Sequence, residues 1–284
     1  MIINEEFERA NRHVYEQMTE LLNSRIFHQN SIELLPAYFI LAEANIGLGG
    51  ARLKKAEEFL IAAQWNLLKT TQDDQGKGTG NEDCLVDDKE LEQYRATIHK
   101  TFGRLFMAQN RPNAAEQALK ELTKGIYLEC IEHGPESIYL CSSYYYMGQL
   151  FQKEGGHSVP KARAFYSKII EIWKKFIIEN DLDPMVDYQI QNVEPLYYDE
   201  AEKHLEKILI FFDMEFGPHD TLTAECQFSY ALVSLKRGKT NEAMDDMHKT
   251  LQIYRENLGE YDRKTKEVEL VIQRIQERLQ MANE

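Results

Sequence analysis

The sequence predicts an all-α solenoid, in which helical hairpins stack one after another along the chain. The first observation is that small residues recur in pairs with two spacings. Twelve residues separate Gly103 from Ala115 and Ala231 from Ala243, and fourteen separate Ala42 from Ala56 and Gly148 from Ala162. The second is that the alanine expected on each second helix recurs about every forty residues, except where an acidic segment intervenes. These alanines are Ala56, Ala115, Ala162, Ala201 and Ala243.

Composition agrees with long helices and limits the classes of partner. Only seven prolines and fifteen glycines interrupt 284 residues, and 43% of the residues are apolar. The net charge of −14 opposes binding to nucleic acid or to anionic lipid, because both are negatively charged. No run of about 18 apolar residues is present, so we expect no membrane span. The acidic start, MIINEEFERA, is unlike a secretory signal. The four cysteines form no CxxC pair and indicate reduced thiols in the cytoplasm.

The first helices are indicated by apolar residues at helical spacing. We expect an amphipathic helix over residues 4–27, which has the pattern of a second helix with no partner before it. Either the array begins on this N-terminal half-repeat, or the partner helix was lost or is supplied by another chain. A second helix should run from a cap at Ser31, with Pro36 in its first turns, to the Gly49-Gly50 pair. Its partner should run from about Leu53 to Leu68, with Ala56, Leu60 and Ala63 on its packed face.

Residues 72–90, QDDQGKGTGNEDCLVDDKE, are rich in Gly, Asp and Glu. This composition predicts a mobile acidic loop between two hairpins. The stretch GKGTG superficially suggests phosphate binding, but it lacks the GxxxxGK[ST] spacing and a preceding strand. We therefore reject a P-loop.

The next hairpin lies between Phe102 and Leu122. Phe102, Gly103 and Phe106 are expected on the packed face of its first helix, and residues 110–113 form the turn. The packed face of the second helix should then consist of Ala115, Leu119 and Leu122.

The remaining chain continues the pattern. Ser137 should cap a first helix that is followed by a partner helix over residues 160–177, with Ala162, Tyr166 and Ile169 packed. Residues 181–200 are harder to assign, with a short helix from Asp183-Pro184 to Glu194-Pro195. A second helix with Ala201, Leu205 and Ile208 follows, and Asp220 or Thr221 should cap the next. The last hairpin packs Tyr230, Ala231, Ser234, Ala243, Met247 and Thr250, and a charged helix over residues 263–281 caps the array.

These hairpins resemble the tetratricopeptide repeat (TPR), whose pattern is W-x2-L-G-x2-Y…A-x3-F…P. The fullest match is Tyr144-x2-Met147-Gly148-x2-Phe151 with Ala162-x3-Tyr166. The resemblance implies one TPR-like domain over residues 1–284, coiled as a right-handed superhelix. It would contain about five repeats, the N-terminal half-repeat and the C-terminal capping helix.

A closer resemblance covers Ser31 to Thr70, SIELLPAYFILAEANIGLGGARLKKAEEFLIAAQWNLLKT. This segment is similar to one that follows the zinc finger in the MYND-finger TPR proteins of motile cilia. GRLFMAQNRPNAAEQAL and FYSKIIEIW are also similar to that family, and the likeness weakens after about residue 180. The family includes a TPR accessory subunit of axonemal inner dynein arm d, which pairs with a second TPR subunit. Clustered Cys and His ligands are missing here, so the finger and its roles do not carry over.

Catalytic and metal-binding patterns are not evident. The eight histidines include no HExxH and no pair at i, i+4, and the four cysteines (Cys84, Cys130, Cys141, Cys226) form no CxxC. We expect no cofactor, reduced thiols that serve in packing, and a protein that is not an enzyme. An enzyme with Cys or His nucleophilic chemistry remains an alternative, and it requires an accessible thiol of lowered pKa.

The first helices of TPR arrays form their concave face, so the resemblance places candidate partner-binding residues there. They are Phe39, Glu43, Ile46, Lys100, Arg104, Met107, Tyr145, Gln149, Gln152, Phe228, Leu232 and Leu235. Lys100 and Arg104 resemble two basic positions of the carboxylate clamp that holds chaperone tails. Glu43 stands where that clamp needs an asparagine, which disfavours a chaperone-tail role.

The resemblance implies a non-catalytic scaffold in an axonemal inner dynein arm of the cilium, part of the cytoskeleton. Its partners would be a second TPR subunit or a dynein heavy-chain tail in a hetero-oligomeric complex. The alternative is a general cytosolic TPR adaptor that binds cargo or peptide segments, as kinesin light chains do.

Overall fold

The computed structural model describes residues 2–25, 27–76, 86–109, 111–181 and 195–283. Throughout these residues the regular structure is helical, and no strand occurs. Contacts divide the chain into two compact units, Met1–Pro135 and Glu136–Glu284. Each unit is described below by itself.

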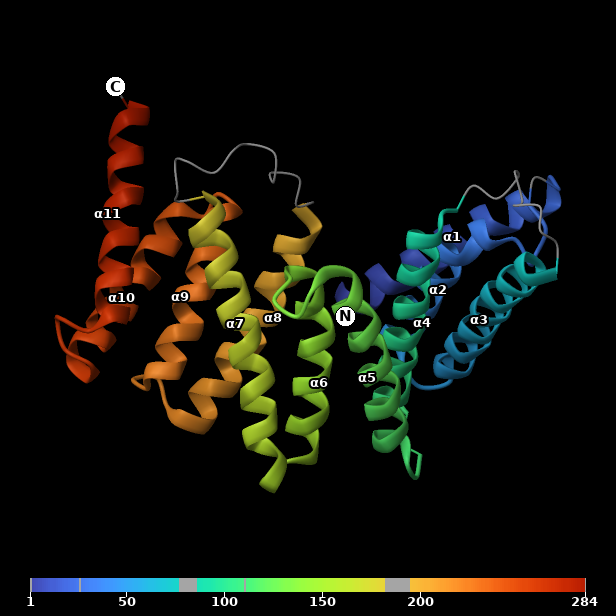
Figure 1. Cartoon of the computed structure of the whole chain (residues 1–284), viewed down its shortest axis with the longest axis horizontal. Helices are drawn as coiled ribbons and strands as arrows, with labels where there is room; N and C mark the ends of the chain where they lie inside the picture. The colour runs from blue at the N-terminus through green and yellow to red at the C-terminus, as the bar shows by residue number, and fades with distance from the viewer. Residues whose placement is uncertain (1, 26, 77–85, 110, 182–194, 284) are drawn as a thin grey trace. The chain divides into compact units, whose positions relative to one another are not determined.

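The first unit consists of helices that each pack on the neighbours next to them in sequence. They are α1 (Ile2–Asn23), the short 3-10 turn η1 (Ile32–Leu34), α2 (Leu35–Leu48), α3 (Arg52–Gly76), α4 (Asp88–Ala108) and α5 (Ala114–His133). Helices α2 and α3 form one hairpin and α4 and α5 form another, and α4 packs on both α2 and α3 (Figure 1). Helix α1 packs on α2. This is the sequential hairpin packing that the sequence predicts.

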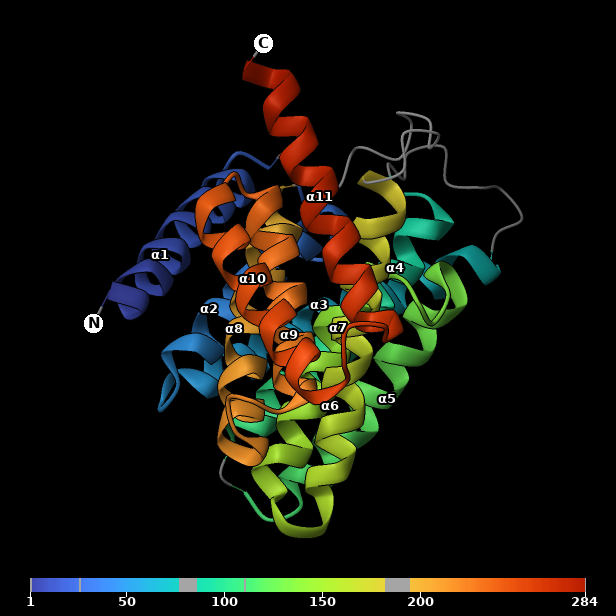
Figure 2. The same ribbon diagram turned by 90° about the vertical axis from the view of Figure 1, so that its left-hand side faces the viewer.

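The second unit contains two short 3-10 turns, η2 (Ile138–Leu140) and η3 (Gly156–Ser158), and six α-helices among its described residues. The helices are α6 (Cys141–Glu154), α7 (Val159–Asp181), α8 (Pro195–Phe216), α9 (Thr221–Lys236), α10 (Thr240–Asn257) and α11 (Arg263–Asn283). Helix α9 packs against α7, α8 and α10, and α11 packs on α10 (Figure 2).

Several predicted helix ends are confirmed and have clear local causes. Helix α2 has Pro36 in its first turn and ends at Gly49, whose φ of 66° suits glycine. Asp220 caps α9 by accepting a hydrogen bond from the amide of Leu222, 2.7 Å away. Ser137 accepts one from the amide of Tyr139 at 3.4 Å, although the element that it caps is the turn η2.

Ser31 does not act as the predicted cap. Its hydroxyl accepts a hydrogen bond from the amide of His28, 3.1 Å away, on the N-terminal side. The turn η1 follows Ser31 without a side-chain cap, and α2 begins only at Leu35. The serine therefore stabilises the loop before the helix.

Two segments differ from expectation or fall outside the description. Helix α3 continues to Gly76 and α4 begins at Asp88, so both ends of the segment 72–90 are helical. Residues 77–85, with Cys84, lie outside the described residues, as do 182–194, where a short helix was expected.

The packed faces of most second helices are as predicted. Every predicted packed residue of α3, α7, α8 and α10 is at most 2% exposed. These are Ala56, Leu60, Ala63, Ala162, Tyr166, Ile169, Ala201, Leu205, Ile208, Ala243, Met247 and Thr250.

Helix α5 is the exception. Leu122 is buried as predicted, but Ala115 is exposed, and the helix buries Ala114 and Ala118 instead. The start of the packed face is therefore shifted by one residue towards the N-terminus. The reason is the turn: Asn113 has a left-handed φ of 64°, and α5 starts at once with Ala114 directed inward.

Close helix approach is visible where a glycine faces a large side chain. A Cβ atom at position 103 would lie 2.5 Å from Cγ of Leu122, so Gly103 allows α4 and α5 to meet there. A Cβ at position 148 would lie 2.3 Å from the ring of Tyr166, so Gly148 has the same role between α6 and α7. Both glycines pack as the sequence predicts.

Candidate functional site

The predicted partner-binding residues on α2 and α4 lie together in the first unit. Phe39 is 8% exposed, and its ring packs on Tyr94 of α4 with the ring centroids 5.9 Å apart. Ile46 packs, partly buried, on the same hydrophobic core. Met107 is partly buried near the end of α4. This face therefore contributes to the packing between hairpins as well as to the surface.

The two basic residues of this face each contact a carboxylate. Nη1 of Arg104 donates to Oε1 of Glu43 on α2, and Nζ of Lys100 donates to Oε1 of Glu129 on α5 at 3.2 Å. The side chain of Glu129 is only 10% exposed. Arg104 thus joins α4 to α2, and Lys100 joins α4 to α5. Each positive charge is balanced by a carboxylate next to it.

A second ionic cluster links α4 to α5. Nδ1 of His99 lies 2.6 Å from Oε2 of Glu121, and Nζ of Lys124 lies 2.8 Å from Oε1. Burial opposes ionisation of Glu121, but the hydrogen bonds from Lys124 and His99 outweigh it, and the pKa of this carboxyl is lowered.

In the second unit, the predicted residues on α6 take part in contacts within the unit. Tyr145 is 3% exposed and stacks on His204 of α8, with ring centroids 3.8 Å apart. Its hydroxyl accepts a hydrogen bond from Gln149 at 2.8 Å, and burial raises the pKa of this phenol. Gln152 is exposed and accepts a hydrogen bond from the hydroxyl of Tyr166 at 2.7 Å.

The predicted residues on α9 are mostly inside the second unit. Phe228 is 1% exposed and Leu232 is 0% exposed, and Leu235 is partly buried. Helix α9 is enclosed by α7, α8 and α10, so its apolar positions pack inward. In this structure Phe228 and Leu232 are not accessible to a partner.

An exposed apolar stripe runs along α3 and was not among the predicted site residues. Ile61 is 55% exposed, Trp65 55% and Leu68 48%, at i, i+4 and i+7. The ammonium of Lys69 lies 5.4 Å from the ring centroid of Trp65. The sequence held a signal for this stripe, because α3 has a second apolar face beside Leu60, Ala63 and Leu67. We call Ile61, Trp65 and Leu68 the α3 stripe.

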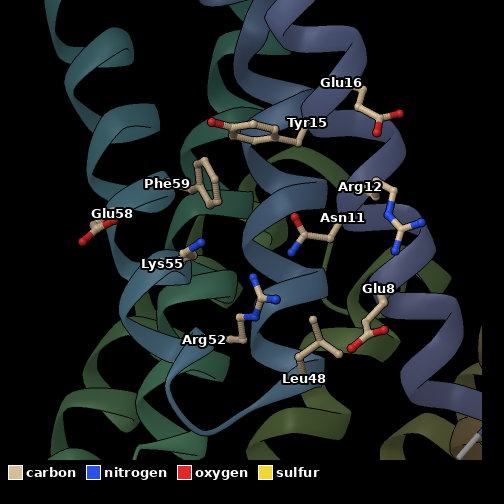
Figure 3. A pocket seen from close by; sticks show the side chains of 10 residues that line it. All are labelled: Glu8, Asn11, Arg12, Tyr15, Glu16, Leu48, Arg52, Lys55, Glu58 and Phe59. Carbon is tan, nitrogen blue, oxygen red and sulfur yellow. The ribbon is translucent and has the colours of Figure 1, made fainter.

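A pocket of about 530 Å³ opens between α1 and α3 (Figure 3). Both helices pack on α2, whose Leu48 lies at one end of the pocket. The ring of Phe7 lies against Gly47, where a Cβ atom would come within 2.5 Å of the ring, and this contact brings α1 close to α2. Residue type alone could not reveal the pocket, because it depends on how α1 rests on α2.

Two of the described cysteines, Cys141 and Cys226, are buried. Burial raises the pKa values of Cys141 and Cys226, which keeps both side chains as thiols at neutral pH. In the described part of the chain, no three His, Cys, Asp or Glu side chains lie close enough to hold a metal ion. Among the same residues, none of the helices has the length and apolar character to cross a membrane.

No protein-family model matches the sequence.

Proposed function

We propose that this protein is a non-catalytic adaptor of the TPR type that works inside an axonemal inner dynein arm. Its partner would be a second TPR subunit or a dynein heavy-chain tail. The sequential packing of helical hairpins supports the adaptor class, since stacked hairpins offer long surfaces for protein partners. The ciliary assignment rests on the sequence resemblance of residues 31–70.

The observation that carries the proposal is the exposure of the α3 stripe. Trp65 and Leu68 belong to the AQWxxLK end of the segment that resembles the ciliary family. Both side chains are about half exposed, so each presents apolar surface to solvent in the described structure. Aromatic side chains surrounded by apolar neighbours are typical anchors of protein interfaces. We therefore assign the α3 stripe as the main contact with the partner.

The concave-face residues have a secondary role in this proposal. Glu43 and Gln152 remain accessible and could set the register of a bound partner. Tyr145, Phe228 and Leu232 would act indirectly, because they hold the helices of the second unit together.

The second candidate is a cytosolic TPR adaptor for cargo or peptide segments, which the hairpin packing supports equally. Fractionation of ciliated cells separates the two. An inner-arm component resists detergent and leaves the axoneme with dynein at high salt, whereas a cytosolic adaptor is released by detergent alone. Release of this protein by detergent, with inner-arm dynein left behind, would sink the axonemal proposal.

A further inference from the structure

Three basic and three acidic side chains line the pocket between α1 and α3. Arg12 lies on α1, and Arg52 and Lys55 lie on the first turn of α3. None of these three side chains forms an ion pair with a described residue. By contrast, Lys100, Arg104 and Arg111 each contact a carboxylate. Because these three side chains line one pocket and have no described carboxylate partner, they are available to an anionic group.

The directions of the side chains strengthen this reading. Figure 3 shows Arg52, Lys55 and Asn11 pointing into the space between the two helices. Glu8, Glu16 and Glu58 also line the pocket, but Glu16 and Glu58 extend away from that space. The side chains that point into the pocket are therefore more basic than its lining as a whole.

One wall of the pocket is apolar. Tyr15 is 53% exposed, and Phe59 lies opposite it, partly buried on the hydrophobic core. An occupant that uses both features carries carboxylates next to an apolar side chain.

Phosphate groups are a poorer match. Helix N-termini bind phosphate through free backbone amides. Here the amide of Arg52 donates to the carbonyl of Gly49 at 3.1 Å, and that of Leu53 donates to the carbonyl of Gly50 at 3.3 Å. The first amides of α3 are thus engaged, and recognition falls to the side chains.

We propose that this pocket binds an acidic peptide segment of a partner protein, with Asp or Glu carboxylates on Arg12, Arg52 and Lys55. An apolar side chain of the segment packs between Tyr15 and Phe59. This site is separate from the α3 stripe, so either can fail without the other.

Fluorescence anisotropy with a labelled peptide of alternating Glu and Leu residues tests the proposal. We expect the Arg52→Ala and Lys55→Ala variants to bind about three- to tenfold more weakly, since each loses a partly exposed charge-assisted contact. Lys54→Ala is the matched control, because Lys54 is exposed on the same helix but does not line the pocket. Trp65→Ala should also leave the affinity for this peptide unchanged.

Four outcomes would overturn the proposal. The first is equal binding by a variant with both Arg52→Glu and Lys55→Glu that has the circular dichroism spectrum of the wild type. The second is equal affinity for the peptide with Gln in place of Glu. The third is displacement of the peptide by inorganic phosphate at constant ionic strength, which would assign the pocket to phosphate. Peptide-independent dimerisation through the pocket, seen by sedimentation and lost in the double variant, would assign it to a second copy of the chain.

Discussion

Arg104 on α4 donates a hydrogen bond from its guanidinium to the carboxylate of Glu43 on α2. The contact joins residues 61 positions apart and ties the two hairpins of the first unit together. Its side chains are 21% and 43% exposed, so water screens the pair. The pair stabilises the arrangement of α2 and α4 modestly and leaves little surplus positive charge there.

A double-mutant cycle with Glu43→Ala and Arg104→Ala should give a coupling energy of about 0.2–1 kcal/mol, as expected for exposed pairs. Urea unfolding of the four proteins measures it.

Lys100→Ala should lower the free energy of unfolding by about 1–3 kcal/mol, more than Arg104→Ala does, because it leaves the buried carboxylate of Glu129 without this partner. Equal losses of unfolding free energy for Lys100→Ala and Arg104→Ala would show that the deeper burial of the Lys100–Glu129 pair does not affect stability.

The packing register of α5 can be tested with two alanines on the same helix. Ala118→Leu should destabilise the protein by about 1–3 kcal/mol, because position 118 is 0% exposed and faces the core. Ala115→Leu is the matched control and should change stability by less than about 0.5 kcal/mol, because position 115 is exposed. Thermal unfolding followed by circular dichroism gives both values. A larger loss of stability for Ala115→Leu than for Ala118→Leu would contradict the packing seen here and would support the packed face predicted from the sequence.

Acid should weaken the second unit through Glu225 on α9. Its carboxylate contacts Lys174 of α7 at 3.2 Å and Lys264 of α11 at 2.9 Å. Burial alone would raise the pKa of Glu225, but the two lysines outweigh it and lower the pKa of this carboxyl below its ordinary value. The stability that this group contributes is therefore complete above about pH 4.5 and is lost as the pH falls through the lowered folded pKa.

Glu225→Gln tests this dependence. At pH 7 the variant should be about 1–3 kcal/mol less stable than the wild type, because it loses charged hydrogen bonds in a mostly buried place. The difference should narrow as the pH drops from 5 towards 3. A difference that stays constant across this range would show that ionisation of Glu225 does not contribute.

Local sequence signals predicted much of the fold. Helical spacing predicted the hairpins and the buried positions of α3, α7, α8 and α10, because these depend on residues within one helix. In α5 the prediction was correct for Leu122 and wrong for Ala115, because the start of the packed face depends on the left-handed backbone at Asn113 rather than on apolar spacing. The prediction that Ser31 caps a helix was wrong, because its hydroxyl accepts a hydrogen bond from the preceding loop instead.

The candidate surfaces were harder to predict from sequence. Carrying positions over from a repeat pattern could not indicate that α9 is enclosed on three sides, which buries Phe228 and Leu232. It also could not show that Arg104 meets Glu43, a contact between distant parts of the chain. The α3 stripe was detectable in principle, since Ile61, Trp65 and Leu68 repeat at helical spacing outside the core face.

We propose above all that the α3 stripe attaches this protein to an inner dynein arm. The most direct measurement quantifies inner-arm dynein heavy chains in axonemes from ciliated cells that lack the protein. These cells are then supplied with the wild type, Trp65→Glu or the exposed control Lys54→Glu. We predict that dynein is reduced without the protein, is restored by the wild type and by Lys54→Glu, and stays low with a folded, expressed Trp65→Glu variant. A full complement of inner-arm dynein in cells without the protein would contradict the account.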